Sequence, residues 1–441
     1  MENTEVVKQI VDHIKTIDFS RTAVGAEGVS LFETTIRYLG GLVSAYDFLT
    51  GPFKGTVDKD SVQTILDQAV NLAELLSVAF DTPSGVPIND LVFNGPNGPV
   101  TGSATTNGIA TIGTLILEWT RLSDLTGNDK YANLTRKGEN WLLDVKNPEV
   151  GEPYPGLIGT DVNVADGTFA DSNGGWNGGT DSFYEYLIKM YIYDSKRFGV
   201  FKDRWVAAID SSIKYLASHP SSRPDLTFLA AYNGAGQSKL NFVSSHLACF
   251  DGGNIILGGL TLDKDEYVKF GLKLVEGCHE TYLGTAAGIG PESFRWQDSK
   301  LGNVSNNGGA PSDQAAFYAK KGFWITSSAY ILRPEVIESY YYAYRATGDR
   351  KYQDWAWDAF LHINKTCSAG VGFSAVTDVN AAAGTGGSFY DSQESFWFAE
   401  VLKYSYLIQA GEAPYQVNAD HHNQWVFNTE AHPVKVAGKP I

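Results

Sequence analysis

Several acidic residues lie at predicted helix starts or on helix faces, beside apolar and aromatic neighbours. Glu335 and Glu338 follow Pro334, which fits the first position of a helix, and their spacing of three places both carboxylates on one helix face. Two like charges side by side need a cation, a shared proton or solvent. Glu292 and Glu394 have aromatic neighbours. Aromatic rings that stack on sugar faces, next to carboxylates that bind hydroxyls and move protons, are typical of a pyranose site.

Two further acids have structural explanations that compete with a catalytic one. Glu33 and Arg37 are four residues apart, and on an exposed helix face such a pair is worth about 0.2–0.5 kcal/mol. Their neighbours are nearly all apolar or small, so we expect this pair to be buried. Asp181 follows a glycine-rich loop and begins a helical pattern, where a lone Asp stabilises the helix dipole. Taken alone, neither acid identifies a site.

Composition and motifs exclude several function classes. The 441 residues include 50 acidic and 34 basic ones, a formal net charge of -16, and no Lys/Arg stripe, so nucleic acid is not an expected partner. The sequence contains no dinucleotide fingerprint, P-loop, GxSxG or HExxH motif. The histidines lack spaced Cys or His partners, so a zinc site is not expected. No apolar run of about 18 residues occurs, so we expect no transmembrane segment.

Helical periodicity recurs along the whole chain and must position these acids. Apolar residues at spacings of three and four mark helices at 30–49, 62–79, 108–125, 130–145, 182–193, 205–217, 262–276, 334–347, 351–363 and 394–408. Short strands or hairpins are expected in loops near 225–231 and 415–426. No composition shift or long linker marks a boundary, so we expect a single domain over residues 1–441. Helix pairs without a strict repeat favour a closed ring over an open solenoid.

The cysteines and the N-terminal residues leave the compartment open. Cys249, Cys278 and Cys367 permit one disulfide and one free thiol. The first residues, MENTEVVKQIVDHI, predict an amphipathic helix and lack the basic start and apolar run of a signal peptide. Weak support for a secretory protein comes from three N-glycosylation tripeptides, which begin at Asn133, Asn303 and Asn364.

Seven segments together resemble glycoside hydrolase family 47, the class I α-1,2-mannosidases. The matching segments are LFETTIRYLGGLVSAYD (31–47), DSFYEYLIK (181–189), HLACFDGG (246–253), LRPEVIES (332–339), YRATGDRKYQDWAW (344–357), ESFWFAEVLKY (394–404) and NTEAHP (428–433). They follow the family's order over almost the whole chain, which makes the resemblance highly specific. The fold that it implies is all-α, a single (α/α)7 barrel with a few short β-hairpins in its loops.

The resemblance also implies a role for each candidate residue. Glu33 matches the carboxylate proposed as general acid, acting directly or through a water, and Asp181 is the other candidate acid. Glu335 matches the general base that activates the attacking water. Thr429 matches the threonine whose carbonyl and hydroxyl oxygens bind Ca²⁺, the implied cofactor. The carboxylates that would hold the metal's waters and the sugar are Glu338, Glu394 and Glu430. Partners of the sugar or of the carboxylates are expected to be Arg37, His246 and Arg333.

The implied function is that of an inverting, Ca²⁺-dependent exo-α-1,2-mannosidase that trims high-mannose N-glycans on glycoproteins. Such an enzyme separates its acid and base by roughly 6.5–9.5 Å, so that a water fits between the base and the sugar. The alternative is a catalytically weak protein that binds mannose glycans in the same cleft. The family's disulfide corresponds to Cys249 and Cys278, which leaves Cys367 free and favours the secretory pathway, in the ER or Golgi lumen, or secretion. The expected oligomeric state is a monomer.

Two departures from the family pattern carry expectations of their own. Family members have a further helical segment ahead of the position where this sequence starts, so we expect a barrel incomplete at its N-terminus, with an open seam and exposed apolar surface. Vertebrate-type members have Arg two positions before the residue that matches Asp181, whereas this chain has Gly179. With DGGN at 251–254, this loop resembles the secreted fungal branch. An open cleft at Gly179 predicts broad trimming of α-1,2-linked mannose.

Overall fold

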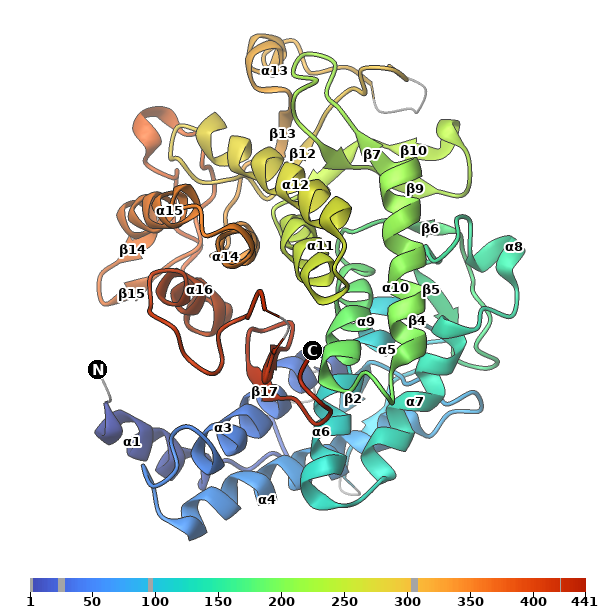
Figure 1. The fold of residues 1–441 in the computed structure, drawn as a ribbon, viewed down its shortest axis with the longest axis vertical. Helices are drawn as coiled ribbons and strands as arrows, with labels where there is room; N and C mark the ends of the chain where they lie inside the picture. The colour runs from blue at the N-terminus through green and yellow to red at the C-terminus, as the bar shows by residue number, and fades with distance from the viewer. Residues whose placement is uncertain (1–2, 23–27, 94–97, 303–307, 421) are drawn as a thin grey trace.

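The helices of the computed structural model are arranged in a ring (Figure 1), and the structure describes residues 3–22, 28–93, 98–302, 308–420 and 422–441. The α-helices are α1 (Thr4–Ile14), α2 (Leu31–Thr34), α3 (Gly40–Thr50), α4 (Lys59–Leu76), α5 (Ile109–Gly113), α6 (Ile116–Thr126), α7 (Lys130–Leu143), α8 (Pro148–Gly151), α9 (Asp181–Tyr193), α10 (Gly199–Ser211), α11 (Phe250–Thr261), α12 (Asp265–Gly284), α13 (Ala315–Lys321), α14 (Glu335–Thr347), α15 (Lys351–Cys367) and α16 (Leu402–Leu407). Neighbours pack in pairs, among them α3 with α4, α6 with α7, α9 with α10, α11 with α12, and α14 with α15. The predicted all-α class is confirmed.

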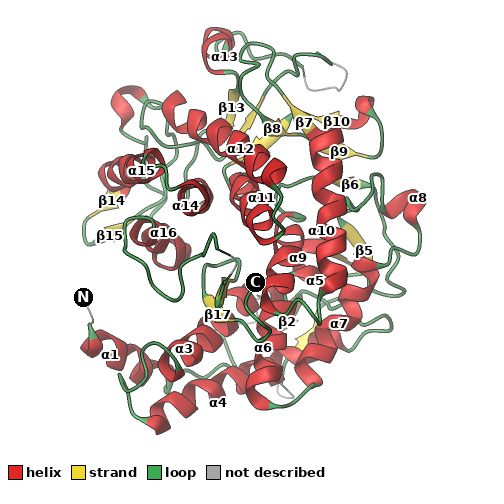
Figure 2. Cartoon of the chain, in the orientation of Figure 1, coloured by secondary structure: helices red, strands yellow, loops and turns green. Residues whose placement is uncertain are grey.

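Short antiparallel strands lie in the connections between the helices (Figure 2). They are β1 (Gly28–Ser30), β2 (Asp90–Val92), β3 (Val100–Thr101), β4 (Thr106–Gly108), β5 (Asp161–Asn163), β6 (Asn173–Gly174), β7 (Ala217–Ser218), β8 (Phe228–Leu229), β9 (Ala231–Asn233), β10 (Leu240–Asn241), β11 (Val243–Ser245), β12 (Ser293–Arg295), β13 (Trp324–Ser327), β14 (Ser368–Ala369), β15 (Gly372–Phe373), β16 (Trp425–Phe427) and β17 (Pro433–Lys435). The hairpins predicted in loops are confirmed, although β16 lies at the end of the predicted range and pairs with β17 beyond it.

Three helices were not predicted from the sequence: the short helices α8 and α13, and the longer α11. α11 contains four glycines in FDGGNIILGGLT, and glycine has a low helix propensity. Packing explains them, because α11 and α12 approach closely. A Cβ at Gly252 would lie 3.1 Å from the backbone oxygen of Gly271, and one at Gly258 would lie 2.1 Å from the Trp205 ring. Tertiary contact with the neighbouring helices therefore overrides local propensity here.

The described residues include three π-helical turns, of which Ser212–Leu216 follows directly on α10. Thr35–Leu39 forms such a turn between α2 and α3, and Trp397–Val401 forms another ahead of α16. The helix predicted at 394–408 therefore begins only at Trp397. π-helical turns are rare and occur often at functional sites.

The buried side chains form a continuous core from α1 to the C-terminal hairpin. It includes Val11 near one end of the chain and Val434 near the other. A disulfide joins Cys249, next to the start of α11, to Cys278 in α12, as the resemblance implied. Cys367 is a buried free thiol.

An apolar groove of about 780 Å³ lies between α1, α3 and the region of α16. Its lining includes Ile10 and Tyr406, which are 54% and 63% exposed. This groove agrees with the expectation of exposed apolar surface near the N-terminal helices, whereas the open seam stays a prediction. In the part of the chain that the structure describes, no helix is long and apolar enough to cross a membrane.

The hairpin of β16 and β17 reaches the middle of the ring (Figure 1). The Ser44 hydroxyl on α3 donates to the carbonyl oxygen of Pro433 at 2.7 Å, and Lys403 Nζ on α16 donates to the carbonyl oxygen of Ala431 at 2.7 Å. Helices from both ends of the chain thus hold the C-terminal turn, residues 428–432, in place.

Candidate active site

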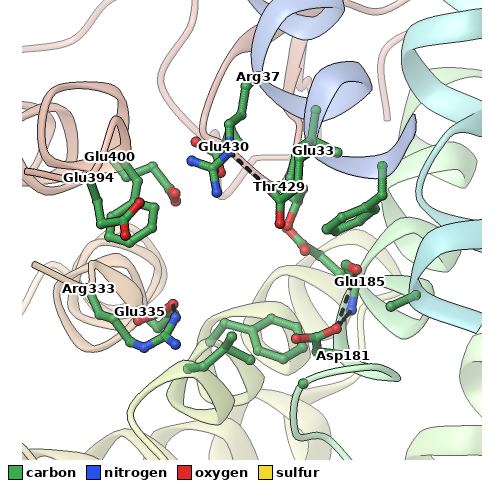
Figure 3. A pocket seen from close by; sticks show the side chains of 18 of the residues that line it. Glu33, Arg37, Asp181, Glu185, Arg333, Glu335, Glu394, Glu400, Thr429 and Glu430 are labelled. Carbon is green, nitrogen blue, oxygen red and sulfur yellow. Dashed lines mark hydrogen bonds and ion pairs between the residues drawn. The ribbon is translucent and has the colours of Figure 1, made fainter. Parts of the chain in front are cut away.

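A cavity of about 800 Å³ contains most of the residues predicted from the sequence (Figure 3). Its lining includes Glu33, Arg37, Asp181, Arg333, Glu335, Glu338, Glu394, Thr429 and Glu430. They come from α2 and the π-helical turn that follows it, from the starts of α9 and α14, from the segment ahead of α16 and from the C-terminal turn. Residues far apart in the sequence therefore meet in one cavity.

His246 was also predicted to contact the sugar or a carboxylate, and it does not line the cavity. Its Nδ1 lies 2.8 Å from Glu335 Oε2, and its Nε2 lies 2.7 Å from the Tyr282 hydroxyl. The residue is only 2% exposed, so it lies behind Glu335. The structure therefore favours the carboxylate contact and not the sugar contact, because the ring is buried between Glu335 and Tyr282.

Glu335, the first residue of α14, has two cationic or hydrogen-bonding neighbours. Besides His246, Arg333 Nη1 lies 3.5 Å from Glu335 Oε1, and Arg333 is itself held by Glu292, with Nε 2.7 Å from Oε2. Burial disfavours the charged form of Glu335, but the hydrogen bond from His246 and the charge of Arg333 outweigh burial, so its pKa lies below the ordinary value. The structure therefore holds Glu335 as a carboxylate, the form that a general base needs.

Asp181 has the opposite environment in the same cavity. It begins α9, and its Oδ1 accepts the backbone N–H of Ser182 at 2.8 Å. Removal from water raises its pKa to about 7, and the negative charges of Glu185 and Glu335 act in the same direction. Asp181 therefore both begins helix α9 and lines the cavity. A carboxyl group that keeps its proton near neutral pH can act as a general acid.

The pair of Glu33 and Arg37 is less buried than predicted. Their side chains are 49% and 25% exposed, with Arg37 Nε 2.8 Å from Glu33 Oε2. The expectation of a buried pair is wrong because both side chains face the open cavity. Arg37 also places Nη1 3.0 Å from Glu430 Oε1, and its guanidinium lies 5.4 Å from the centre of the Phe396 ring. Arg37 thus links two acids at one wall of the cavity.

Further carboxyl groups of the cavity raise one another's pKa values. Burial raises the pKa of Glu338 to about 8, and the charge of Glu185 acts in the same direction. Burial also raises the pKa of Glu400, and the negative charge of Glu430 raises it further. Carboxylates crowded in this way need a cation or shared protons.

The surroundings of Thr429 fit a calcium ion that is held largely through water. Among the described residues, no group of three or more His, Cys, Asp or Glu side chains could hold a metal directly. Thr429 lines the cavity, and the neighbouring Glu430 has a buried Oε2 without a hydrogen-bond partner. Calcium takes 6–8 oxygen ligands, including backbone carbonyls and waters. A threonine with carboxylates placed to bind the metal's waters is a suitable donor set.

Comparison with known proteins identifies the family. The family model "Glycosyl hydrolase family 47" matches residues 1–436. The mannosyl-oligosaccharide alpha-1,2-mannosidase 1B of Aspergillus phoenicis is 55% identical over 439 residues, which cover 99% of this chain and 81% of the relative. The chain belongs to glycosyl hydrolase family 47. The Emericella nidulans protein of the same name is 56% identical over 437 residues, which cover 99% of the family 47 chain and 82% of the relative.

Solved structures confirm the fold expected for a family 47 protein. The alpha-1,2-mannosidase from Trichoderma reesei superposes with a TM-score of 0.93 at 52% identity, over 98% of this chain and 87% of that chain. The (α/α)7 fold is thereby confirmed. A D-mannose isomerase, with a TM-score of 0.54 at 11% identity over 92% of this chain and 97% of that chain, shares the fold alone.

Two acids of this family 47 site, Glu185 and Glu400, were missed in the sequence, and both line the cavity. Glu185 lies one helical turn after Asp181 on α9, so the i,i+4 spacing was an available signal. Glu400 lies in the π-helical turn Trp397–Val401, where a regular 3.6-residue period does not predict which residues share a face. Glu394, the acid predicted from this segment, lines the cavity as well.

Proposed function

We propose that this protein is an inverting, Ca²⁺-dependent exo-α-1,2-mannosidase that trims high-mannose N-glycans on glycoproteins in the secretory pathway or outside the cell. The observation that carries the proposal is the contrast between two acids in one cavity. His246 and Arg333 stabilise the charged form of Glu335, whereas burial keeps Asp181 protonated to about pH 7. Acids whose environments drive their pKa values apart are typical acid–base pairs.

The chain's own residues divide the reaction between them. Glu335 accepts the proton of a water that attacks the anomeric carbon, while Asp181 or Glu33 donates a proton to the departing glycosidic oxygen. Both candidate acids line the cavity. Asp181 is our preferred donor because burial raises its pKa to about 7. A calcium ion on Thr429 would supply positive charge that binds two sugar hydroxyls and supports ring distortion. Glu338, Glu400 and Glu430 would bind that ion's waters.

Aromatic side chains and glycines suit the cavity for mannose. Phe250 and Phe396 line it and offer ring faces to sugar C–H groups. A Cβ at Gly178 would meet nothing within 4 Å, and one at Gly179 would meet only Thr160, at 3.7 Å. This open side of the cleft supports broad trimming of α-1,2-linked mannose.

Release of mannose from Man9GlcNAc2 tests the proposal, with Ca²⁺ and then with EDTA. We expect calcium-dependent release, with β-mannose as the first product by NMR and with several branches trimmed. α-Mannose as the first product would contradict inversion, and removal of one branch alone would contradict broad trimming. Binding of the glycan without release, by a folded protein, would favour the alternative of a glycan-binding protein.

A further inference from the structure

The C-terminal turn that lines the cavity is anchored by a buried hydrogen-bond network that the reaction above does not use. Asn428 is fully buried, and its Nδ2 donates to the carbonyl oxygen of Ile36 at 2.9 Å and to Glu118 Oε1 at 2.8 Å. Its Oδ1 accepts the backbone N–H groups of Glu430 at 2.9 Å and His432 at 2.8 Å. The amide thus uses both its donors and both its acceptor positions.

Tyr186 on α9 completes the network. Its hydroxyl accepts the backbone N–H of Thr429 at 3.2 Å and donates to Glu118 Oε1 at 2.6 Å. Glu118, on α6, is fully buried, so one carboxylate oxygen receives hydrogen bonds from both Tyr186 and Asn428. The carboxyl group of Glu118 has no access to solvent, and its two donors both connect it to the C-terminal turn.

These contacts fix both peptide planes that flank Thr429. A trans peptide is planar, so the carbonyl of one residue points away from the N–H of the next. Because Asn428 Oδ1 holds the N–H of Glu430, it also sets the direction of the Thr429 carbonyl. Because Tyr186 holds the N–H of Thr429, it sets the preceding plane. The carbonyl oxygen and the Cβ that carries the hydroxyl therefore have defined positions.

We propose that Glu118, acting through Tyr186 and Asn428, is a positioning residue for the calcium-binding oxygens of Thr429. The proposal rests on the proposed role of Thr429 as the calcium ligand. Glu118 does not line the cavity, so it does not act on the substrate. Hydrogen-bond partners that orient metal ligands typically change metal affinity by about 10–100-fold when they are removed.

Calcium titration by calorimetry, with Ca²⁺ alone and chelator-treated protein, tests the proposal independently of activity. Tyr186→Phe removes the acceptor for the Thr429 N–H, and Glu118→Leu removes the shared acceptor. We expect each variant to bind calcium about 10-fold more weakly. Glu118→Gln keeps an acceptor oxygen and should restore most of the affinity. If Glu118→Leu fails to fold, the single-atom change Tyr186→Phe retains the test.

Two control variants separate positioning from a general cost of burial. Tyr184 lies on the same helix as Tyr186 and is equally buried, but its hydroxyl accepts the N–H of Ile158, at 3.0 Å, and not that of Thr429. Tyr184→Phe therefore removes a buried hydroxyl outside the network. Glu139→Leu removes a buried acid on α7 that has no hydrogen-bond partner for either oxygen. We expect both controls to keep wild-type calcium affinity, whatever their effect on thermal stability in EDTA.

The outcomes distinguish this inference from the proposed function. Weaker calcium binding in Tyr186→Phe and Glu118→Leu but not in the controls supports the inference. Wild-type affinity in a folded Tyr186→Phe protein would overturn it and leave the proposed function standing. An equal loss in Tyr184→Phe would also overturn it. Absence of calcium binding by the unmodified protein would overturn the calcium proposal and this inference together.

Discussion

Acids of similar chemistry acquire different protonation states in this cavity because their contacts differ. Glu335 has a hydrogen bond from His246 and the nearby charge of Arg333, whereas Asp181 accepts hydrogen bonds from Ser182 and has acidic neighbours. One pKa unit corresponds to about 1.4 kcal/mol of difference between the charged and neutral forms. Contacts that shift a pKa by a few units therefore decide which acid accepts a proton and which donates one.

Glu335→Gln should remove the base while keeping the size and shape of the side chain. General-base catalysis contributes about 10²–10⁴-fold, so we expect kcat for mannose release to fall by at least about 10²-fold. Glu412→Gln, which changes an exposed partner of Arg345, is the matched control and should retain wild-type kcat. Activity in Glu335→Gln close to that of the control would show that another residue is the base.

The pH dependence of kcat/KM should identify the acid. The donor must be protonated, so activity should fall as pH rises through about 7, the pKa of Asp181. The base must be charged, so activity should persist below the ordinary glutamate pKa, because the pKa of Glu335 is lowered. Asp181→Asn should lose the alkaline limb together with most of the activity. If Glu33→Gln loses that limb instead, Glu33 is the acid.

The sequence predicted most of the site because the acids lie in segments whose order and amino-acid sequence match the family. It did not show that His246 lies behind Glu335, since burial depends on how β11 and α14 pack. It also gave no reason to select Glu118, whose apolar neighbours Leu117 and Trp119 mark α6 only as a buried helix. The hydrogen bond from Asn428 to Glu118 spans 310 positions of the chain and the one from Tyr186 spans 68, and no local pattern encodes either of them.

At the scale of elements, helix starts and π-helical turns carry the chemistry, and packed helices support them. α11 and α12 show why helix prediction was incomplete. Their contact requires glycines such as Gly252 and Gly271, which local propensity counts against a helix. Periodicity located the other long helices because their apolar faces repeat regularly, but their ends shifted where a turn or cap intervened.

The disulfide between α11 and α12 should stabilise this pair of elements. Replacing Cys249 and Cys278 by alanine opens a loop of 29 residues, and we expect the free energy of unfolding to fall by roughly 3–4 kcal/mol. Guanidinium unfolding of both proteins, with and without reductant, measures the effect. Reductant should destabilise the unmodified protein and leave the double variant unchanged. If reductant also lowered the free energy of unfolding of the double variant, the disulfide would not be the source of the reductant's effect.

At the scale of the whole molecule, the ring has one continuous core, and the cavity proposed to bind calcium lies inside the ring. We expect one cooperative calorimetric transition, as the single-domain prediction requires, and a higher Tm with Ca²⁺ than with EDTA. Calcium at 100 times its Kd would add about 2.7 kcal/mol. Thr429→Ala removes one donor oxygen and should reduce that increase. Two separate transitions would contradict the single domain, and an unchanged increase in Thr429→Ala would contradict its role as a ligand.

The contact between Asn428 and Ile36 has a consequence for biosynthesis. Their separation of 392 positions means that the first helices leave the ribosome long before the turn that completes the cavity. Until that turn is synthesised, the carbonyl oxygen of Ile36 and the carboxylate of Glu118 lack the amide that binds both. A nascent chain that has not yet reached residue 428 therefore lacks one wall of the cavity, so the proposed activity requires the C-terminal turn to have been synthesised.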